Sequence, residues 1–117
     1  RYPHFLIPRD GQLIQFVSTQ DRAWHAGASN WRGQTRCNDF SVGIELEGCD
    51  SKPYTAAQYE QLAALTQALR VRYPRINSVA GHHEIAPARK TDPGACFEWA
   101  RFEHQANIPA EARKSAL

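Results

Sequence analysis

One long helix is the feature of this sequence that most constrains its fold. Thr55-Ala56-Ala57-Gln58 is a capping box, in which the Thr hydroxyl and the Gln side chain satisfy amides that the first turn leaves free. Pro74 ends the helix, because a proline disfavours helical backbone in the residue before it. Between these two signals, apolar side chains recur at helical spacing: Tyr59, Leu62, Leu65, Leu69 and Tyr73. We expect this helix to be scaffold.

The segments on both sides of the helix have patterns typical of strands. Residues 5–7 and 13–17 flank an Asp10-Gly11 turn, which indicates a hairpin. Residues 76–81 suggest another short strand, and residues 97–102 suggest a short helix. Strands before and after one strong helix predict an α/β fold with a single mixed β-sheet flanked by helices.

A strict alternation from Ser41 to Glu47 predicts one further strand and a candidate catalytic group. Apolar residues point to one face, whereas Glu45 and Glu47 share the other face with Gly43. Glu45 is the candidate general base, because a strand fixes a side chain more firmly than a loop does. Glu47 is its rival, and a solvated strand carboxylate is the alternative interpretation of either residue.

Size and composition narrow the class of protein. A chain of 117 residues fits one domain, and we predict that it spans 1–105 with a flexible tail at 106–117, where Ala, Glu, Arg, Lys and Ser dominate. The net charge of +2, without a dense basic stripe, argues against a nucleic-acid binder. A membrane-spanning helix needs ~20 consecutive apolar residues, and the sequence contains no such run. Three cysteines without motif spacing favour free thiols in a reducing compartment.

The run from Gly81 to Gly94 concentrates more reactive groups than any other segment. Of its two histidines, His82 ends a predicted strand, and Asp92 follows ten residues later, so the two could converge on one metal ion. Lys90 lies between them and could stabilise an oxyanion. The alternative is that these are polar loop residues that cap backbone groups.

Three further residues are candidates for ligand contacts. Trp24 could belong to the core or could stack on a sugar or peptide. Arg36 and Arg89 could be ordinary surface charges or could clamp a carboxylate through paired hydrogen bonds. The other histidines, His25 among them, are expected to be structural or surface residues.

Three segments of the sequence resemble one family. Arg22–Gly27, Cys37–Gly48 and Gly81–Gly94 are similar, in this order, to the AmpD-type amidases, which belong with the phage lysozyme-type amidases and the peptidoglycan recognition proteins. The resemblance covers about residues 4–103. It implies a cytoplasmic enzyme of muropeptide recycling, which hydrolyses the amide between anhydro-N-acetylmuramic acid and L-Ala of the stem peptide.

The resemblance also implies roles for individual residues. His82 and Asp92 match two of three Zn²⁺ ligands, Lys90 matches the lysine that stabilises the tetrahedral intermediate, and Glu45 matches the catalytic glutamate. Residues expected to contact the substrate are Trp24, Arg36, Ala86 and Arg89. The implied partner is a small anionic muropeptide bound by a monomer, with neither nucleic acid nor membrane involved.

One feature of the family has no counterpart in this sequence. The first zinc ligand is expected to be a His upstream of residue 1, on a strand that precedes a long loop and a helix. We therefore expect the domain to lack its N-terminal strand and helix. The alternatives are a muropeptide-binding module without catalysis, or an inactive fragment. A structural domain whose polar loop has no function is the third hypothesis, and it requires all three motif matches to be accidental.

Overall fold

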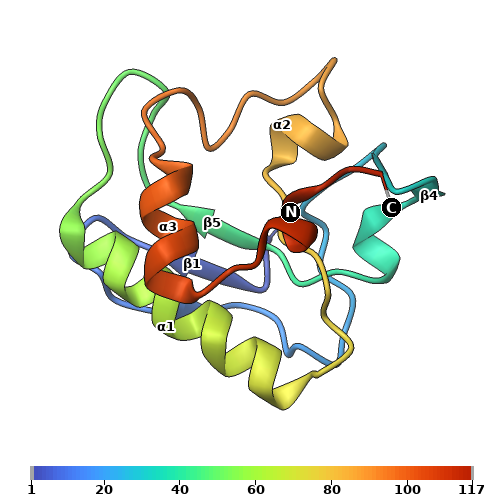
Figure 1. Ribbon diagram of the computed structural model, residues 1–117, viewed down its shortest axis with the longest axis horizontal. Helices are drawn as coiled ribbons and strands as arrows, with labels where there is room; N and C mark the ends of the chain where they lie inside the picture. The colour runs from blue at the N-terminus through green and yellow to red at the C-terminus, as the bar shows by residue number, and fades with distance from the viewer. Residues whose placement is uncertain (1, 117) are drawn as a thin grey trace.

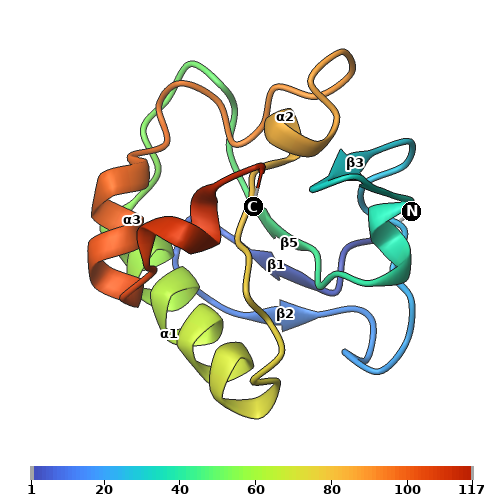
Figure 2. The same ribbon diagram turned by 45° about the vertical axis from the view of Figure 1, so that its right-hand side comes forward.

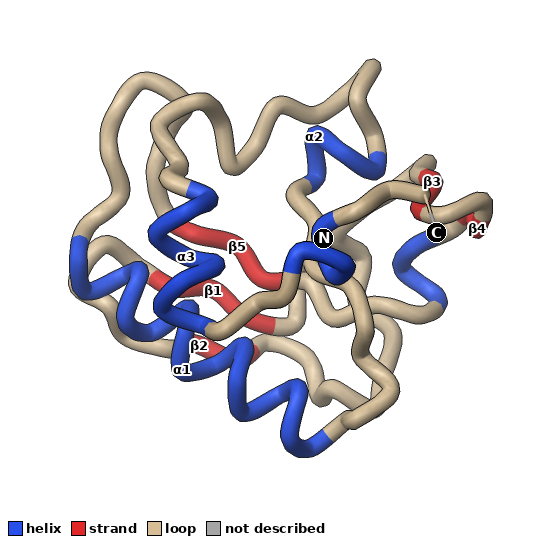
Figure 3. The backbone as a smooth tube through the Cα atoms, viewed as in Figure 1, coloured by secondary structure: helices blue, strands red, loops and turns tan. Residues whose placement is uncertain are grey.

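A mixed three-stranded sheet lies at the centre of the computed structural model, which describes residues 2–116. Strand β1 (Phe5–Ile7) pairs with β2 (Ile14–Gln15) antiparallel and with β5 (Ile44–Leu46) parallel, in the order β2-β1-β5 (Figure 3). The predicted hairpin and the mixed sheet are therefore confirmed. The strands are short, and β5 has a partner on only one side among the described residues.

Two helices cover this sheet and supply most of the core. Helix α1 (Ala56–Arg72) starts with the predicted capping box and packs against β1 and against α3 (Trp99–Ala106) (Figure 1). The buried side chains of this core include Phe5, Ile7, Tyr54, Tyr59, Leu62, Leu65, Phe97, Phe102 and Ile108. The predicted helix at 97–102 begins two residues later and continues to Ala106.

A second, smaller cluster lies away from α1 and α3. It joins β3 (Asn30–Trp31), β4 (Gln34–Thr35), the 3-10 turn Cys37–Asp39 and the short helix α2 (His82–Ile85) (Figure 2). Its buried members are Ala26, Trp31, Cys37, Ile85 and Ala86. Residues 18–40 thus contain a second small sheet and their own buried residues.

The segment before α2 differs from the prediction. Residues 76–81 form no strand: Val79 instead donates its amide to the Ala112 carbonyl at 2.9 Å. His82 therefore starts a helical turn, which ends before Pro87, and does not end a strand. The alternation that suggests a strand here is too short to distinguish pairing with a sheet from pairing with a turn.

The predicted flexible tail also differs from the structure. Ala106, Ile108 and Ala112 are buried, and a 3-10 turn spans Ala110–Arg113. The Arg113 guanidinium donates to Glu84 at 2.6 Å and to Glu103 at 3.1 Å, and it lies 3.5 Å from the centre of the Trp99 ring. Small apolar residues spaced among charges are enough to pack this segment onto the core, although its composition is typical of a surface.

We expect Arg113→Ala to lower the free energy of unfolding by about 2 kcal/mol, because Glu84 and Glu103 would each lose a partly buried cationic partner. The measurement is urea unfolding, with Arg75→Ala as the control because Arg75 is exposed. Equal midpoints for both variants would contradict the packed arrangement of the C-terminal segment.

Gln58 joins α1 to two strands. It is fully buried, its amide donates to the carbonyls of Ile7 at 3.1 Å and Glu47 at 2.8 Å, and its side-chain oxygen accepts from the Thr55 amide at 3.0 Å. The side chain therefore satisfies three backbone groups at the junction of β1, the end of β5 and the start of α1.

We expect Gln58→Ala to destabilise the fold by about 1–3 kcal/mol, since it removes the hydrogen bonds to the Glu47 carbonyl and the Thr55 amide and leaves the Ile7 carbonyl with the Glu47 amide as its donor. Gln67→Ala is the matched control, because Gln67 is exposed on the same helix and its loss should change stability by less than about 0.5 kcal/mol. Chemical unfolding that gives both variants the same stability would show that Gln58 does not hold this junction together.

No helix among residues 2–116 combines the length and the apolar character that a membrane crossing requires.

Candidate functional site

His82 and Asp92 meet at the start of α2. His82 Nδ1 lies 2.6 Å from Asp92 Oδ2, with the His82 side chain 10% exposed and the Asp92 side chain 46% exposed. A backbone hydrogen bond holds the two ends of the intervening loop together: the His83 amide donates to the Asp92 carbonyl at 3.1 Å. The predicted convergence of these two side chains is therefore present, and it arises from a helical turn followed by a closed loop.

Outer contacts fix this loop to the rest of the molecule. The Tyr54 hydroxyl donates to the Pro93 carbonyl at 2.7 Å, and the Thr91 hydroxyl donates to Asp50 at 2.6 Å. Glu84 accepts from the Gly81 amide at 2.9 Å, which satisfies an amide at the start of α2. Of the run Gly81–Gly94, Glu84 is thus a structural residue, and it is also the partner of Arg113.

The charges around Asp92 favour its ionised form. The hydrogen bond with His82 is the main cause that lowers the pKa of Asp92, and the positive charge of Lys90 adds a smaller contribution, while partial burial opposes both. Lys90 is half-buried, and its amide donates to the Ala86 carbonyl at 2.9 Å. The site therefore combines a carboxylate that stays ionised with a nearby ammonium group.

The structure adds His25, which the sequence analysis assigned to no role. Its Nδ1 lies 3.2 Å from His82 Nε2, and its Nε2 lies 3.0 Å from the Ser41 hydroxyl. Burial is the main cause that lowers the pKa of His25 to about 4, with repulsion from His82, His4 and Lys90 adding to it. The ring is therefore neutral at neutral pH. The one sequence signal that could have marked His25 as a site residue is its position in Arg22–Gly27, a segment that carries part of the family resemblance.

Gly43 makes room for the His25 ring. A Cβ at this position would overlap the ring, so only glycine allows so close an approach. The Gly43 amide donates to His4 Nδ1 at 3.0 Å, and His4 Nε2 contacts the Asp21 carbonyl at 2.7 Å. His4 is thus a buried structural residue, as expected, and the space beside the glycine holds a side chain where we expected a ligand.

Glu45 lies on the same face of its strand as Gly43, because side-chain directions alternate along a strand. Its side chain is exposed and lines a large open cavity of about 1520 Å³, which His25, His82 and Asp92 also line. The rival residue Glu47 lines the same cavity, and one of its oxygens accepts from the Arg9 amide at 2.9 Å. The two carboxylates thus share the cavity and differ in this hydrogen bond.

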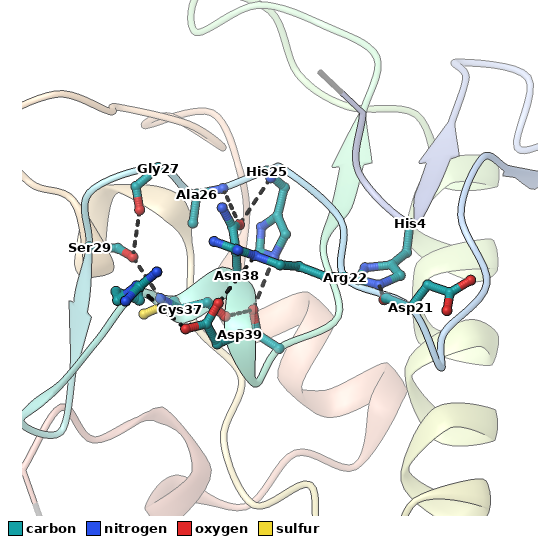
Figure 4. A network of polar contacts seen from close by, with 12 residues as sticks. His4, Asp21, Arg22, His25, Ala26, Gly27, Ser29, Cys37, Asn38 and Asp39 are labelled. Carbon is teal, nitrogen blue, oxygen red and sulfur yellow. Dashed lines mark hydrogen bonds and ion pairs between the residues drawn. The ribbon is translucent and has the colours of Figure 1, made fainter.

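Trp24 and Arg36 line a second, shallow cavity of about 300 Å³ beside the first segment of the resemblance. Trp24 is 58% exposed, and the Arg22 guanidinium lies 4.1 Å from the centre of its ring. Arg22 and Arg36 both pair with Asp39, at 3.1 and 3.5 Å (Figure 4). An exposed indole with two cations beside it is suited to a ligand with an apolar face and a negative charge.

Ala86 and Arg89 have structural contacts. Ala86 is buried in the second cluster, and the Arg89 guanidinium donates to the carbonyls of Ala26 at 2.7 Å and Ala28 at 2.6 Å. Gly27 gives Arg89 this access, since a Cβ there would come within 2.9 Å of the guanidinium. Substrate contacts of Ala86 and Arg89 stay predictions.

The donor set of His82 and Asp92 fits part of a zinc site. An imidazole nitrogen and a carboxylate oxygen are both common zinc ligands, and a hydrogen bond of 2.6 Å brings His82 Nδ1 and Asp92 Oδ2 together. Among residues 2–116, no three His, Cys, Asp or Glu side chains are placed to hold one metal ion. The part of the protein described here therefore brings two candidate ligands together.

Comparisons with known proteins show the family of this chain. The family model for N-acetylmuramoyl-L-alanine amidases matches residues 1–95. The 1,6-anhydro-N-acetylmuramyl-L-alanine amidase AmpD of Citrobacter freundii is 62% identical over 100 residues, which cover 85% of this chain and 54% of the relative. The same enzyme of Escherichia coli strain K12 is 60% identical over 100 residues, with 85% and 55% covered. The chain thus spans about half the length of the curated relatives it matches.

Two solved structures have the same fold. The crystal structure of a selenomethionine AmpD derivative superposes with a TM-score of 0.85 at 59% identity, over 88% of this chain and 58% of that one. The amidase AmiD of E. coli, in complex with anhydro-N-acetylmuramic acid-L-Ala-D-γ-Glu-L-Lys, gives a TM-score of 0.84 at 38% identity, over 92% and 48%. With a family model that matches most of the chain and relatives at these identities, the chain belongs to the N-acetylmuramoyl-L-alanine amidase family.

Proposed function

We propose that this chain carries most of the catalytic centre of a zinc-dependent amidase of muropeptide recycling. The bond it hydrolyses joins N-acetylmuramic acid, in its anhydro form, to L-Ala of the stem peptide. The observation that carries the proposal is the 2.6 Å contact between His82 and Asp92 in a cavity that Glu45 also lines. The names of the relatives support the reaction, and the AmiD complex supports the substrate class.

His82 and Asp92 are the proposed Zn²⁺ ligands within this chain. A zinc ion in a site with one open position polarises a carbonyl group and lowers the pKa of bound water. We propose that the third ligand comes from outside residues 2–116, and the family resemblance assigns it to a His upstream of residue 1.

Glu45 and Lys90 are the proposed catalytic side chains. Glu45 accepts a proton from the attacking water while the water oxygen adds to the amide carbonyl carbon. It then gives this proton to the L-Ala nitrogen as the carbon–nitrogen bond breaks. The Lys90 ammonium stabilises the negative charge that develops on the carbonyl oxygen. Its effect on the pKa of Asp92 supports its closeness to the metal ligands.

Trp24 and Arg36 are the proposed substrate contacts, and Ala86 and Arg89 are expected to border the same ligand. The stem peptide is anionic, so the cations beside Trp24 support this orientation. We also propose that the protein is a monomer and that it lies in the cytoplasm. The three free thiols Cys37, Cys49 and Cys96 support the reducing compartment.

A muropeptide-binding module without catalysis is the second candidate. It is favoured by the finding that residues 2–116 bring only two metal ligands together. Calorimetry separates the two candidates: stable binding of anhydro-N-acetylmuramic acid-L-Ala-D-γ-Glu-L-Lys without release of the peptide favours the module, and turnover favours the enzyme.

The test of the proposed function is hydrolysis of the same muropeptide, followed by mass spectrometry of the products. It is run with this chain alone and with a chimera that adds the part of the C. freundii relative outside the match. We expect the chimera to release the free tripeptide L-Ala-D-γ-Glu-L-Lys. A folded, zinc-loaded chimera that releases no peptide would overturn the proposal.

A further inference from the structure

A chain of polar contacts runs from His82 to the backbone of the 3-10 turn Cys37–Asp39. His82 Nε2 lies 3.2 Å from His25 Nδ1, and His25 Nε2 lies 3.0 Å from Ser41 Oγ. Ser41 Oγ in turn lies 2.5 Å from the Cys37 carbonyl oxygen. None of these contacts involves Asp92, which faces the other nitrogen of His82.

The Cys37 carbonyl, at the end of this chain of contacts, sets the direction of every hydrogen bond in it. A carbonyl oxygen only accepts, so the hydroxyl hydrogen of Ser41 is donated to Cys37. The Ser41 oxygen then accepts from His25 Nε2–H. With its proton on Nε2, the His25 ring turns the lone pair of Nδ1 toward His82, and that lone pair accepts from His82 Nε2–H.

We propose that His25 is a positioning residue that holds a proton on His82 Nε2 and thereby directs His82 Nδ1 to the metal ion. The inference rests on the proposed function for the metal, but the assignment of the Nε2 proton rests only on the contacts within this chain. A metal ion bound at Nδ1 would take the place of the hydrogen bond between Nδ1 and Asp92.

His25 is itself held firmly enough for this role. Its own amide and that of Ala26 donate to Asn38 Oδ1 at 3.0 and 2.9 Å, as Figure 4 shows, and Asn38 is buried. The other side of the ring faces Gly43, which His4 fixes. The His25 backbone is thus anchored by Asn38 and its ring is packed against Gly43, which together keep the ring beside His82.

The chemistry explains why the contact matters. An imidazole that binds a metal through one nitrogen needs a hydrogen-bond partner for the other, because that partner fixes both the tautomer and the ring orientation. Loss of such a partner typically lowers metal affinity by about 10–100-fold. The partner of His82 in this role is the ring of His25.

Zinc affinity tests the proposal in a matched series of variants, measured with the chimera by competition against a chromophoric chelator. His25→Ala removes the acceptor and should weaken zinc binding by about 10–100-fold. His25→Asn keeps an acceptor oxygen where Nδ1 lies and should recover most of the affinity. His104→Asn is the control, because His104 is exposed on α3. Wild-type affinity in a folded His25→Ala variant would overturn the proposal.

The wild-type protein also provides a test that needs no variant and no activity. Nitrogen-15 NMR of the zinc-loaded chain should show His82 protonated at Nε2 and bare at Nδ1, with the Nε2 proton protected from exchange with water. A bare Nε2 would overturn the proposal even if the amidase reaction is confirmed. A protonated Nε2 with no hydrolysis would leave the proposal standing and contradict the proposed function alone.

Discussion

His82→Ala and Asp92→Ala are each expected to lose bound zinc and to lower kcat/KM for anhydromuropeptide hydrolysis by on the order of 10³-fold or more. Each substitution removes one of the two proposed metal ligands, whose side chains lie 2.6 Å apart. The carbonyl would then react with ordinary water, whose pKa is far higher than that of water on zinc. Metal content by mass spectrometry and initial rates, both measured on the chimera, report the two losses together.

The control for this prediction is the neighbouring imidazole. His83 lies on the same short helix, but its ring packs 6.2 Å from that of Trp99 and makes no contact with Asp92 through its side chain. His83→Ala should therefore keep its zinc and most of its activity. Full zinc content in both the His82 and the Asp92 variants would show that the metal ligands have been assigned wrongly.

Glu45→Gln and Lys90→Ala are expected to lower kcat by about 10²–10³-fold while the zinc content and KM change little. Glutamine has the shape of glutamate but cannot accept the proton of the attacking water. The Lys90 variant loses the charge that stabilises the oxyanion, which forms only during the reaction, so the loss falls on kcat. Rates over a range of substrate concentrations separate kcat from KM.

Glu47→Gln is the matched control for the general base. Glu47 directly precedes Gly48 and shares a strand face with Glu45, but it accepts a hydrogen bond from the Arg9 amide. Its loss should change stability more than kcat. If Glu47→Gln loses the activity and Glu45→Gln retains it, the roles of the two carboxylates are reversed.

The scaffold could be predicted from the sequence where one local signal decided the outcome. The capping box at Thr55 and the apolar spacing in α1 both depend on neighbouring residues, so they give the helix within one residue of its observed ends. The Asp-Gly hairpin and the alternation at β5 are equally local. The sequence also identified His82 and Asp92 as partners, although the strand expected before His82 is an extended segment followed by a helical turn.

The remaining features depend on contacts between distant residues. His25 lies 57 positions from His82, and nothing in its neighbourhood distinguishes it from a surface histidine. The packing of residues 106–116 depends on Arg113 reaching Glu84 and Val79, which composition alone does not encode. Gly43 could be recognised as a close approach in a strand, but only the fold shows that the group approaching it is the ring of His25.

Zinc titration tests the central claim of a metal-dependent amidase centre most directly. The chimera is stripped with a chelator, zinc is returned in steps, and bound zinc and hydrolysis of anhydro-N-acetylmuramic acid-L-Ala-D-γ-Glu-L-Lys are measured on the same samples. We expect the rate to rise in proportion to bound zinc and to level off at one equivalent. Undiminished hydrolysis by the zinc-free protein would contradict the account.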